Sequence, residues 1–263
     1  MKKPEFLSPR NAAAFDDADV ASAYRHRVPY PPATFDILVQ LIDPGCRVVL
    51  DVGCGEGALA RPLAPRVDRV DAVDPAAPML AVGERAPGGD HPSIRWILGR
   101  AEDVELKEPY GLVCAGASLH WMDWEVVMPR FASVLTPVGQ LAIVESDDST
   151  VAWRDELLRL IRTYSVNPDW GGTNFDLAAE LEARDLFRLT GRQVLSGPEF
   201  VQPVNDWIES LHSHGSLSRA RLGPAATRAF DDAARDLAAG DGGVVRREAR
   251  TTVVWGRPRN RSA

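Results

Sequence analysis

Three glycines at alternate positions, Gly53, Gly55 and Gly57, could shape a ligand-binding loop. They follow a short apolar stretch, and a strand that turns sharply into a helix needs glycine where its backbone approaches a ligand. Gly53 and Gly55 supply the turn and the close approach, whereas Gly57 lets the following helix pack near the strand. Asp74 lies about 20 residues further on, where a carboxylate can accept hydrogen bonds from both hydroxyls of a ribose. The pattern predicts a nucleotide-type cofactor.

The glycine loop by itself does not name that cofactor. Gly53-x-Gly55-x-x-Ala58 also satisfies the G-x-G-x-x-G/A pattern of dinucleotide-binding folds, and Asp74 would bind the ribose of NAD equally well. A strand-to-helix turn without any ligand is the third interpretation. We set it aside because a strand, three closely spaced glycines and an acidic strand end occur in the required order.

His120 is the residue that we expect to act as a general base, because a neutral imidazole can accept a proton near neutral pH. It lies in a loop after the fourth predicted strand, on the side of an open parallel sheet where ligands bind. The alternative is that His120 only hydrogen-bonds the backbone or packs against the amino-terminal segment. His212 and His214 do not share one helix face at their spacing, which favours a helix cap at the surface.

The remaining side chains that could do chemistry do not point to a specific site. No cluster of His, Asp and Glu has metal-ligand spacing, so we expect no metal. The three cysteines (Cys46, Cys54 and Cys114) show no C-x-x-C pair and predict neither a disulfide framework nor a zinc site. Glu145 ends the fifth predicted strand, where it could point into a substrate cleft or make a structural ion pair.

The elements that must position these residues alternate between strands and helices. Five apolar stretches are typical of strands, at residues 47–52, 69–73, 94–98, 110–115 and 140–145. Helical patterns fall at residues 34–42, after the glycine loop to about 63, at 78–85 and at 124–135. Strands that alternate with helices indicate right-handed crossovers and a mostly parallel sheet.

After residue 146 this rhythm changes. Helical patterns occupy residues 153–164, 176–185, 204–212 and 225–239, and strand patterns occupy 189–195 and 244–255. We therefore predict an α/β fold, a Rossmann-like doubly wound, mostly parallel seven-stranded sheet with a late helical cap insertion. The division is 1–45 lid and helix, 46–145 cofactor-binding core, 146–243 helical cap and substrate region with one strand, and 244–263 last core strand and tail. The Arg-rich tail from Arg257 is expected to be disordered.

Four motifs in register resemble one family. Val49-Leu50-Asp51-Val52-Gly53-Cys54-Gly55-Glu56-Gly57 looks like the first motif of class I S-adenosylmethionine-dependent methyltransferases, an acidic residue followed by G-x-G-x-G. Asp74-Pro75-Ala76-Ala77-Pro78-Met79-Leu80 resembles their second motif, and Gly99-Arg100-Ala101-Glu102-Asp103 resembles the third. Leu119-His120-Trp121-Met122-Asp123-Trp124 is similar to a signature of the methyltransferase-11-like small-molecule subgroup. The segment from Tyr24-Arg25 to Tyr30-Pro31 fits the lead-in of that subgroup.

The resemblance implies an enzyme that moves the methyl group of S-adenosylmethionine to an O, N or C nucleophile of a small molecule, such as a carboxylic acid or secondary metabolite, and releases S-adenosylhomocysteine. An NAD-dependent oxidoreductase and a non-methylating protein that binds S-adenosylmethionine are the alternatives. The cofactor-binding residues that it implies are Asp51, Gly53, Gly55, Gly57, Asp74, Met79, Ala101, Glu102 and Ser118. Asp51 would help to hold the loop and the methionine end of the cofactor. Either Glu102 or Asp103 would meet the adenine amino group, and we prefer Glu102.

The substrate site is expected to involve Tyr24, Tyr30, Trp121 and Trp170. By the resemblance, the first two lie on a segment that folds over the cofactor as a lid. Arg100 departs from the subgroup, which often has a small or acidic residue there.

Composition places the chain among ordinary globular proteins. It has 263 residues, 45% of them hydrophobic and 25% charged. A net charge of −7 disfavours a broad phosphate-binding surface, so no nucleic-acid partner is expected. No apolar run approaches the roughly 20 residues that span a bilayer, and the amino terminus lacks an apolar signal core. We expect a cytoplasmic protein without a membrane partner, monomeric or homodimeric.

Overall fold

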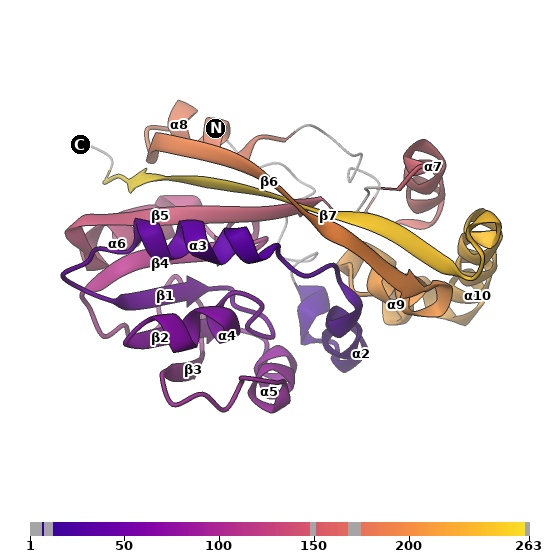
Figure 1. Ribbon diagram of the computed structural model, residues 1–263, viewed down its shortest axis with the longest axis horizontal. Helices are drawn as coiled ribbons and strands as arrows, with labels where there is room; N and C mark the ends of the chain where they lie inside the picture. The colour runs from indigo at the N-terminus through magenta and orange to yellow at the C-terminus, as the bar shows by residue number, and fades with distance from the viewer. Residues whose placement is uncertain (1–6, 8–12, 148–150, 168–174, 261–263) are drawn as a thin grey trace.

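A single seven-stranded sheet forms the centre of the protein (Figure 1). The computed structural model describes residue 7 and residues 13–147, 151–167 and 175–260. The strands are β1 (Val48–Val52), β2 (Arg69–Asp74), β3 (Ile94–Leu98), β4 (Tyr110–Gly116), β5 (Leu135–Asp147), β6 (Phe187–Pro203) and β7 (Val244–Pro258). Their order is β3-β2-β1-β4-β5-β7-β6, with β1 to β5 parallel and β7 antiparallel to both of its neighbours. The prediction of a mostly parallel seven-stranded α/β sheet is confirmed.

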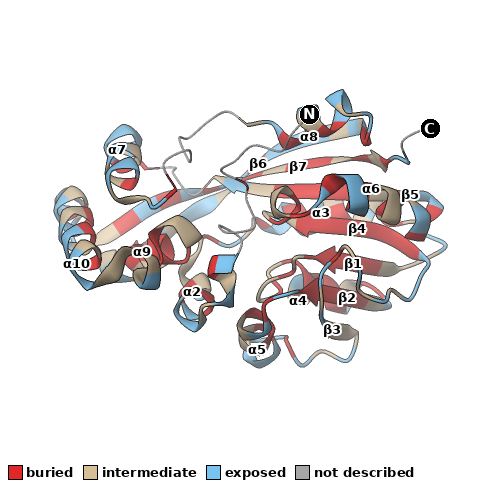
Figure 2. Ribbon diagram, turned by 180° about the vertical axis from the view of Figure 1, so that it is seen from behind, coloured by how far each residue is buried: buried red, intermediate tan, exposed pale blue. Residues whose placement is uncertain are grey.

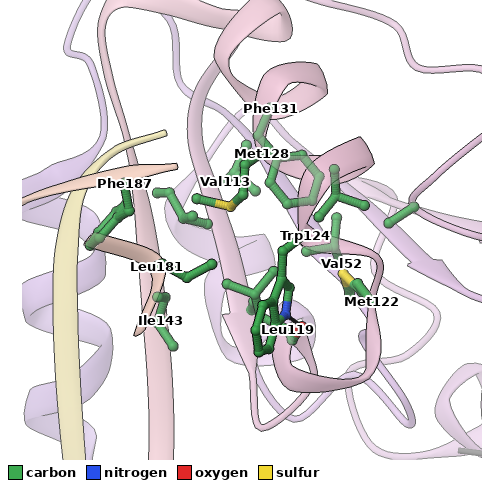
Figure 3. Close-up of a cluster of buried hydrophobic side chains, with 14 of the residues drawn as sticks. Val52, Val113, Leu119, Met122, Trp124, Met128, Phe131, Ile143, Leu181 and Phe187 are labelled. Carbon is green, nitrogen blue, oxygen red and sulfur yellow. Dashed lines mark hydrogen bonds between the residues drawn. The ribbon is translucent and has the colours of Figure 1, made fainter. Parts of the chain in front are cut away.

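Helices cover both faces of the parallel part of the sheet, because its strands are apolar on both sides. On one face lie α3 (Pro32–Leu41) and α4 (Ala60–Leu63), which bury Leu38 and Leu63 against β1 and β4. On the other face lie α6 (Trp124–Val134) and α8 (Leu177–Ala183), whose Trp124, Phe131 and Leu181 form a second core (Figure 3). Nearly all of β4 is buried between the two layers (Figure 2).

The last two strands extend past the parallel sheet and carry a second lobe (Figure 1). Around their far half pack α7 (Arg154–Tyr164), α9 (Val204–His212) and α10 (Arg219–Leu237). Trp207 and Phe230 are fully buried in the apolar core of this lobe. Burying one such side chain stabilises the lobe by roughly 1.5–3 kcal/mol. The buried cluster to which both belong is a core of the lobe's own.

The strand β6 is longer than we predicted. The sequence predicted a strand only at residues 189–195, and the Gly197 and Pro198 that follow it are residue types common in turns. In the structure, the pairing of β6 with β7 shifts register between Ser196 and Glu199, so the two turn-like residues lie in a bulge. A proline, which lacks an N–H, is tolerated at a bulge and on an edge strand such as β6.

The expectation of a disordered tail from Arg257 is wrong for the residues that the structure describes. Arg257 belongs to β7, and its guanidinium donates a hydrogen bond to the carbonyl oxygen of Gly139 at 2.7 Å. The backbone N–H of Arg259 donates to the carbonyl of Leu186 at 2.8 Å. Long-range pairing thus orders a stretch that looks like a solvated tail in isolation.

An amino-terminal strap, defined as residues 13–31, joins the sheet to the second lobe. It contains the 3-10 helix η2 (Ala13–Asp16), α2 (Ala18–Ala23) and the 3-10 helix η3 (Tyr24–His26). The carboxylate of Asp17 caps α2 by accepting a hydrogen bond from the Asp19 N–H at 2.8 Å. α2 packs against both α9 and α5 (Ala77–Arg85), the helix after β2. The strap therefore crosses from one lobe to the other.

A buried ion cluster ties β2, β3 and β4 together. Asp71 is fully buried, and the Nε atoms of Arg69 and Arg95 both lie 3.1 Å from its Oδ1. The Tyr110 hydroxyl donates to Oδ2 of the same carboxylate at 2.6 Å. Burial and this carboxylate raise the pKa of Tyr110. The cluster holds the strand that ends in Asp74.

Candidate active site

A cavity of about 1000 Å³ opens at the carboxyl ends of β1, β2, β4 and β5. The glycine loop and Asp74 line one part of it, and the loop after β4, the strap and the second lobe line the rest. Ligands bind at this edge of open parallel sheets, because the loops diverge there and leave room. The sequence predicted a site at this edge.

The glycine loop forms the wall next to β1. Gly53 has a φ of +63° and Gly55 a φ of +55°, a backbone region that other residues rarely adopt. A Cβ on Gly53 would lie 2.5 Å from the Cβ of Ser118, and one on Gly55 would lie 2.9 Å from the Cε of Met79. The Ser118 hydroxyl donates to the Val52 carbonyl at 2.6 Å. The loop is thus pressed between the neighbouring loop and α5, and only glycine fits there.

Gly57 and Asp51 do not line the cavity. A Cβ on Gly57 would lie 2.5 Å from the ring of Trp96 on β3, so this glycine lets the turn after the loop approach the sheet. Asp51 is buried on β1 beneath the loop, at 1% exposure. Burial, and then the nearby charge of Asp74, raise the pKa of Asp51 to about 7, partly offset by the Ala60 N–H. Asp51 therefore lies beneath the glycine loop and not at the wall of the cavity.

Asp74, at the end of β2, connects the glycine loop to α5. Its Oδ2 accepts a hydrogen bond from the Gly55 N–H, and its Oδ1 accepts one from the Ala76 N–H, both at 2.8 Å. Burial raises the pKa of Asp74, and these two hydrogen bonds oppose the rise. A carboxylate oxygen has more than one lone-pair site, so both oxygens can still accept from a ligand hydroxyl at the cavity wall.

The segment after β3 supplies the next wall. Ala101 and Glu102 line the cavity, whereas Asp103 does not. Oε1 of Glu102 accepts a hydrogen bond from the Asp123 N–H at 3.0 Å and lies 3.2 Å from the Arg100 guanidinium. Of the two carboxylates that the sequence left open, Glu102 is the one at the cavity.

His120 and Trp121 lie on a 3-10 helix, η5 (Leu119–Trp121), directly after β4. Leu119 is buried in the core, and the Trp124 indole donates to its carbonyl at 2.8 Å, which anchors η5. The His120 and Trp121 rings are 4.7 Å apart, and Trp121 meets Phe15 of the strap edge-on at 5.9 Å. Both His120 and Trp121 line the cavity.

The strap closes the cavity opposite the glycine loop. Tyr24 and Tyr30 both line it, and a Cβ on Gly116 at the end of β4 would lie 2.9 Å from the Tyr30 hydroxyl. The Arg27 guanidinium lies 4.0 Å from the centre of the Tyr24 ring. Trp170, the remaining residue expected at the substrate site, lies outside the described residues.

Sequence reasoning missed a contribution from the second lobe. The Nε of Arg27 donates to the Ser213 hydroxyl at 2.7 Å, and its Nη2 donates to the Ser213 carbonyl at 3.1 Å. His214, beside them, lines the cavity. These partners are 186 positions apart in the chain, so no local pattern could pair them.

His212 corrects the expectation of a surface helix cap. It is 2% exposed, with its Nδ1 at 2.7 Å from the Leu217 carbonyl and its Nε2 at 2.7 Å from the Asp231 carboxylate. The two-residue spacing that excluded a shared helix face instead points His212 into the lobe, while His214 borders the cavity. The sequence signal available for this burial was that the two histidines straddle a helix end. The partner Asp231 lies 19 residues away in the chain.

Similarity to known proteins agrees with this geometry. Residues 49–139 match the family model described as a methyltransferase domain. An uncharacterized methyltransferase of Mycobacterium tuberculosis is 35% identical over 144 residues, which cover 54% of this chain and 56% of that protein. Residues 49–139 of this chain are thus similar to a methyltransferase domain, and they supply β2 to β4, nearly all of β1 and the first part of β5.

Two further proteins are similar to this chain. The malonyl-[acyl-carrier protein] O-methyltransferase of Halalkalibacterium halodurans is 33% identical over 118 residues, covering 40% of this chain and 43% of that one. The solved structure of a putative type II methyltransferase from Anaeromyxobacter dehalogenans shares the fold, with a TM-score of 0.64, 24% identity, and coverage of 88% and 97%. The chain spans about half the length of the first curated relatives that it matches.

The matched residues 49–139 contain Asp51, the glycine loop, Asp74, Glu102 and His120. All of these border the cavity except Asp51 and Gly57. The strap and the second lobe lie outside the match. Within the described part of the chain, no helix is long and apolar enough to cross a membrane. Those same residues contain no group of three or more His, Cys, Asp or Glu side chains arranged to hold a metal.

Proposed function

We propose that this chain transfers the methyl group of S-adenosylmethionine to an O, N or C nucleophile of a small molecule and releases S-adenosylhomocysteine. The supporting observation is that one cavity of about 1000 Å³ is bordered both by Asp74 with the glycine loop and by His120 with the strap tyrosines. A cofactor and a compact acceptor can therefore share one enclosed space, as small-molecule sites require.

The residues present fit the cofactor. Asp74 would accept hydrogen bonds from the two ribose hydroxyls, and Glu102 would accept one from the adenine amino group, with Met79 and Ala101 beside the ring. Gly53, Gly55 and Ser118 would line the methionine end, and the buried Asp51 would hold the loop. When bound, S-adenosylmethionine supplies an electrophilic methyl group on a positively charged sulfur.

The chain's own contribution to the reaction is to position the acceptor and to manage its proton. Methyl transfer is an in-line displacement, so holding the nucleophile in line lowers the barrier. His120, fixed by the buried Leu119, would accept the proton from an acceptor that must lose one. Tyr24, Tyr30 and Trp121 would enclose the acceptor and exclude water. The Halalkalibacterium relative is named as a malonyl-[acyl-carrier protein] O-methyltransferase, which supports an oxygen nucleophile, such as that of a carboxylic acid, as one acceptor for this chain.

Direct titration tests the choice of cofactor. We expect S-adenosylhomocysteine to bind the purified chain saturably in isothermal titration calorimetry, and NAD⁺ not to bind. An NAD-dependent oxidoreductase is disfavoured because the dinucleotide fold has six parallel strands, whereas here the strand after β5 in the sheet is antiparallel. Binding of NAD⁺ without binding of S-adenosylhomocysteine would overturn the proposal.

Cofactor binding alone does not separate a methyltransferase from a protein that only keeps the cofactor. We therefore expect transfer of a deuterated methyl group from labelled S-adenosylmethionine to a component of a small-molecule metabolite extract, detected by mass spectrometry. At a cofactor concentration below the wild-type dissociation constant, the label should be reduced with the Asp74→Ala variant, because this variant binds the cofactor more weakly. Tight cofactor binding with no labelled product and no S-adenosylhomocysteine release would favour the non-methylating alternative.

A further inference from the structure

A second, smaller cavity lies on the sheet face beneath the beginning of α8. Its volume is about 310 Å³, and β5, β6, β7 and α8 all contribute to its wall. Most of that wall is apolar, formed by Ile143 and Val254 from the sheet and by Phe175, Leu177 and Ala178 near the start of α8. The polar side chains at this cavity are Glu145, Thr252, Asp176 and Arg192. We call it the side pocket.

The side pocket adjoins the large cavity at Glu145, which borders both. Alternation along β5 puts Ile143 and Glu145 on one face of the sheet, so the carboxylate stands at the end of the apolar floor. Thr252 lies directly opposite Glu145 on β7 in the antiparallel register. The two cavities thus share Glu145 as a wall residue, so a group bound beside its carboxylate lies next to the side pocket.

The charged side chains around Glu145 determine which polar groups of a ligand can bind beside it. The Arg192 guanidinium donates to the Asp176 carboxylate at 2.6 Å, so this cation is already paired. Burial, and then the charge of Asp176, raise the pKa of Glu145, while Arg192 lowers it. A second anion would meet two carboxylates and one paired cation. A hydroxyl or ammonium group would instead donate a hydrogen bond to Glu145.

We propose that the side pocket is a subsite for an apolar group of the methyl acceptor, and that Glu145 binds a hydroxyl or ammonium group adjoining it. The inference rests on the proposed function, because it assigns the substrate class of the same site. The acceptor is then an amphipathic small molecule, with an aryl or short alkyl group in the side pocket and its nucleophile toward His120. In this scheme Glu145 determines specificity, and Thr252 only forms part of the wall of the side pocket.

Three probes of similar shape test the charge preference. Phenethylamine, phenethyl alcohol and phenylacetate share a phenyl group and differ at the polar end. In calorimetric titrations with saturating S-adenosylhomocysteine, we expect the amine and the alcohol to bind at least about tenfold more tightly than the carboxylate, because like charges in a desolvated site repel. Glu145→Gln should reduce that difference to about twofold or less.

A pair of variants at one position tests the location. Thr252→Phe places a ring in the side pocket and should weaken binding of phenethylamine at least about tenfold. Thr252→Val removes the hydroxyl but adds no bulk to the wall, so it should change this binding less than about twofold. Thermal unfolding and the dissociation constant of S-adenosylhomocysteine, unchanged in all variants, would show that each folds. If Thr252→Phe alone fails to fold, the Glu145→Gln comparison still decides.

Three results would overturn the inference: equal binding of the three probes, no effect of a folded Thr252→Phe, or no saturable binding of any probe to a chain that binds S-adenosylhomocysteine. Failure of the wild-type chain to bind S-adenosylhomocysteine would instead contradict the proposed function. The two failures are therefore distinguishable in one set of titrations.

Discussion

Replacing Asp74 by alanine perturbs the point where the glycine loop, α5 and the proposed ribose site meet. The carboxylate accepts backbone hydrogen bonds from Gly55 and Ala76, each at 2.8 Å. The variant removes both, together with the oxygens that we propose bind the ribose hydroxyls. We expect S-adenosylhomocysteine to bind Asp74→Ala more weakly than the wild type.

The expected size follows from competing terms. Hydrogen bonds to a charged group contribute about 1.5–3 kcal/mol each, but the raised pKa of Asp74 shows that burial already disfavours its charge. A net loss of about 1–3 kcal/mol corresponds to a dissociation constant about 5- to 160-fold larger. Asp74→Asn should also weaken binding, because both oxygens accept backbone N–H groups and the amide NH₂ would face one of these donors.

Isothermal titration calorimetry with S-adenosylhomocysteine near neutral pH measures the effect. Asp103→Ala is the matched control, since it removes a carboxylate from a neighbouring loop, and Asp103 itself does not border the cavity. Thermal unfolding of both variants checks that the sheet is intact. We expect the control to bind within about twofold of the wild type, as surface substitutions usually have small effects.

An unchanged dissociation constant for Asp74→Ala would refute the assignment of the ribose to this carboxylate. Equal weakening in Asp74→Ala and Asp103→Ala would show that binding responds to net charge near the cavity rather than to hydrogen bonds at Asp74.

Three further predictions concern the proposed base and two buried carboxylates. His120→Ala should lower turnover about 10²–10⁴-fold with binding of S-adenosylhomocysteine retained, and a drop of less than about tenfold in initial rate would remove His120 as the base. Burial and Asp74 raise the pKa of Asp51 to about 7, so between about pH 4 and 7 the folded protein holds a proton that the unfolded chain has lost. The free energy of unfolding should therefore fall by up to a few kcal/mol as the pH rises through this window and then level off, and Asp51→Asn should lose this component in urea unfolding curves; the same slope in both proteins would contradict it. Asp71→Ala should lower the free energy of unfolding by about 3 kcal/mol, because two guanidiniums lose their buried partner, and a loss below about 1 kcal/mol would show that solvent replaces it.

The local sequence pattern was sufficient to predict most of the strands in the parallel part of the sheet. The predicted strand at residues 94–98 and the predicted helix at 204–212 coincide with β3 and α9. Each is specified by a run of apolar residues with one period, which depends only on near neighbours along the chain. The same holds for the glycine loop, where a required backbone conformation restricts the residue type at Gly53 and Gly55.

Local pattern failed where a residue's partner is distant in the chain. The strand was predicted to end at residue 195, but pairing with β7 carries β6 through a bulge as far as Pro203. Arg257 was predicted to lie in a disordered tail, but its guanidinium donates a hydrogen bond to the carbonyl of Gly139, 118 positions away. His212 is buried because Asp231, on another helix, accepts from its ring.

The sequence by itself determined the order of strands and helices, the conformation of the glycine loop and the acidic end of β2, because short-range sterics and apolar periodicity specify these features. Only the tertiary structure decided how the site is closed. Arg27 binds Ser213 across 186 positions, and Glu145 faces residues from β6, β7 and α8. Such contacts form when the two lobes pack together, and the spacing of residues along one chain carries no record of them.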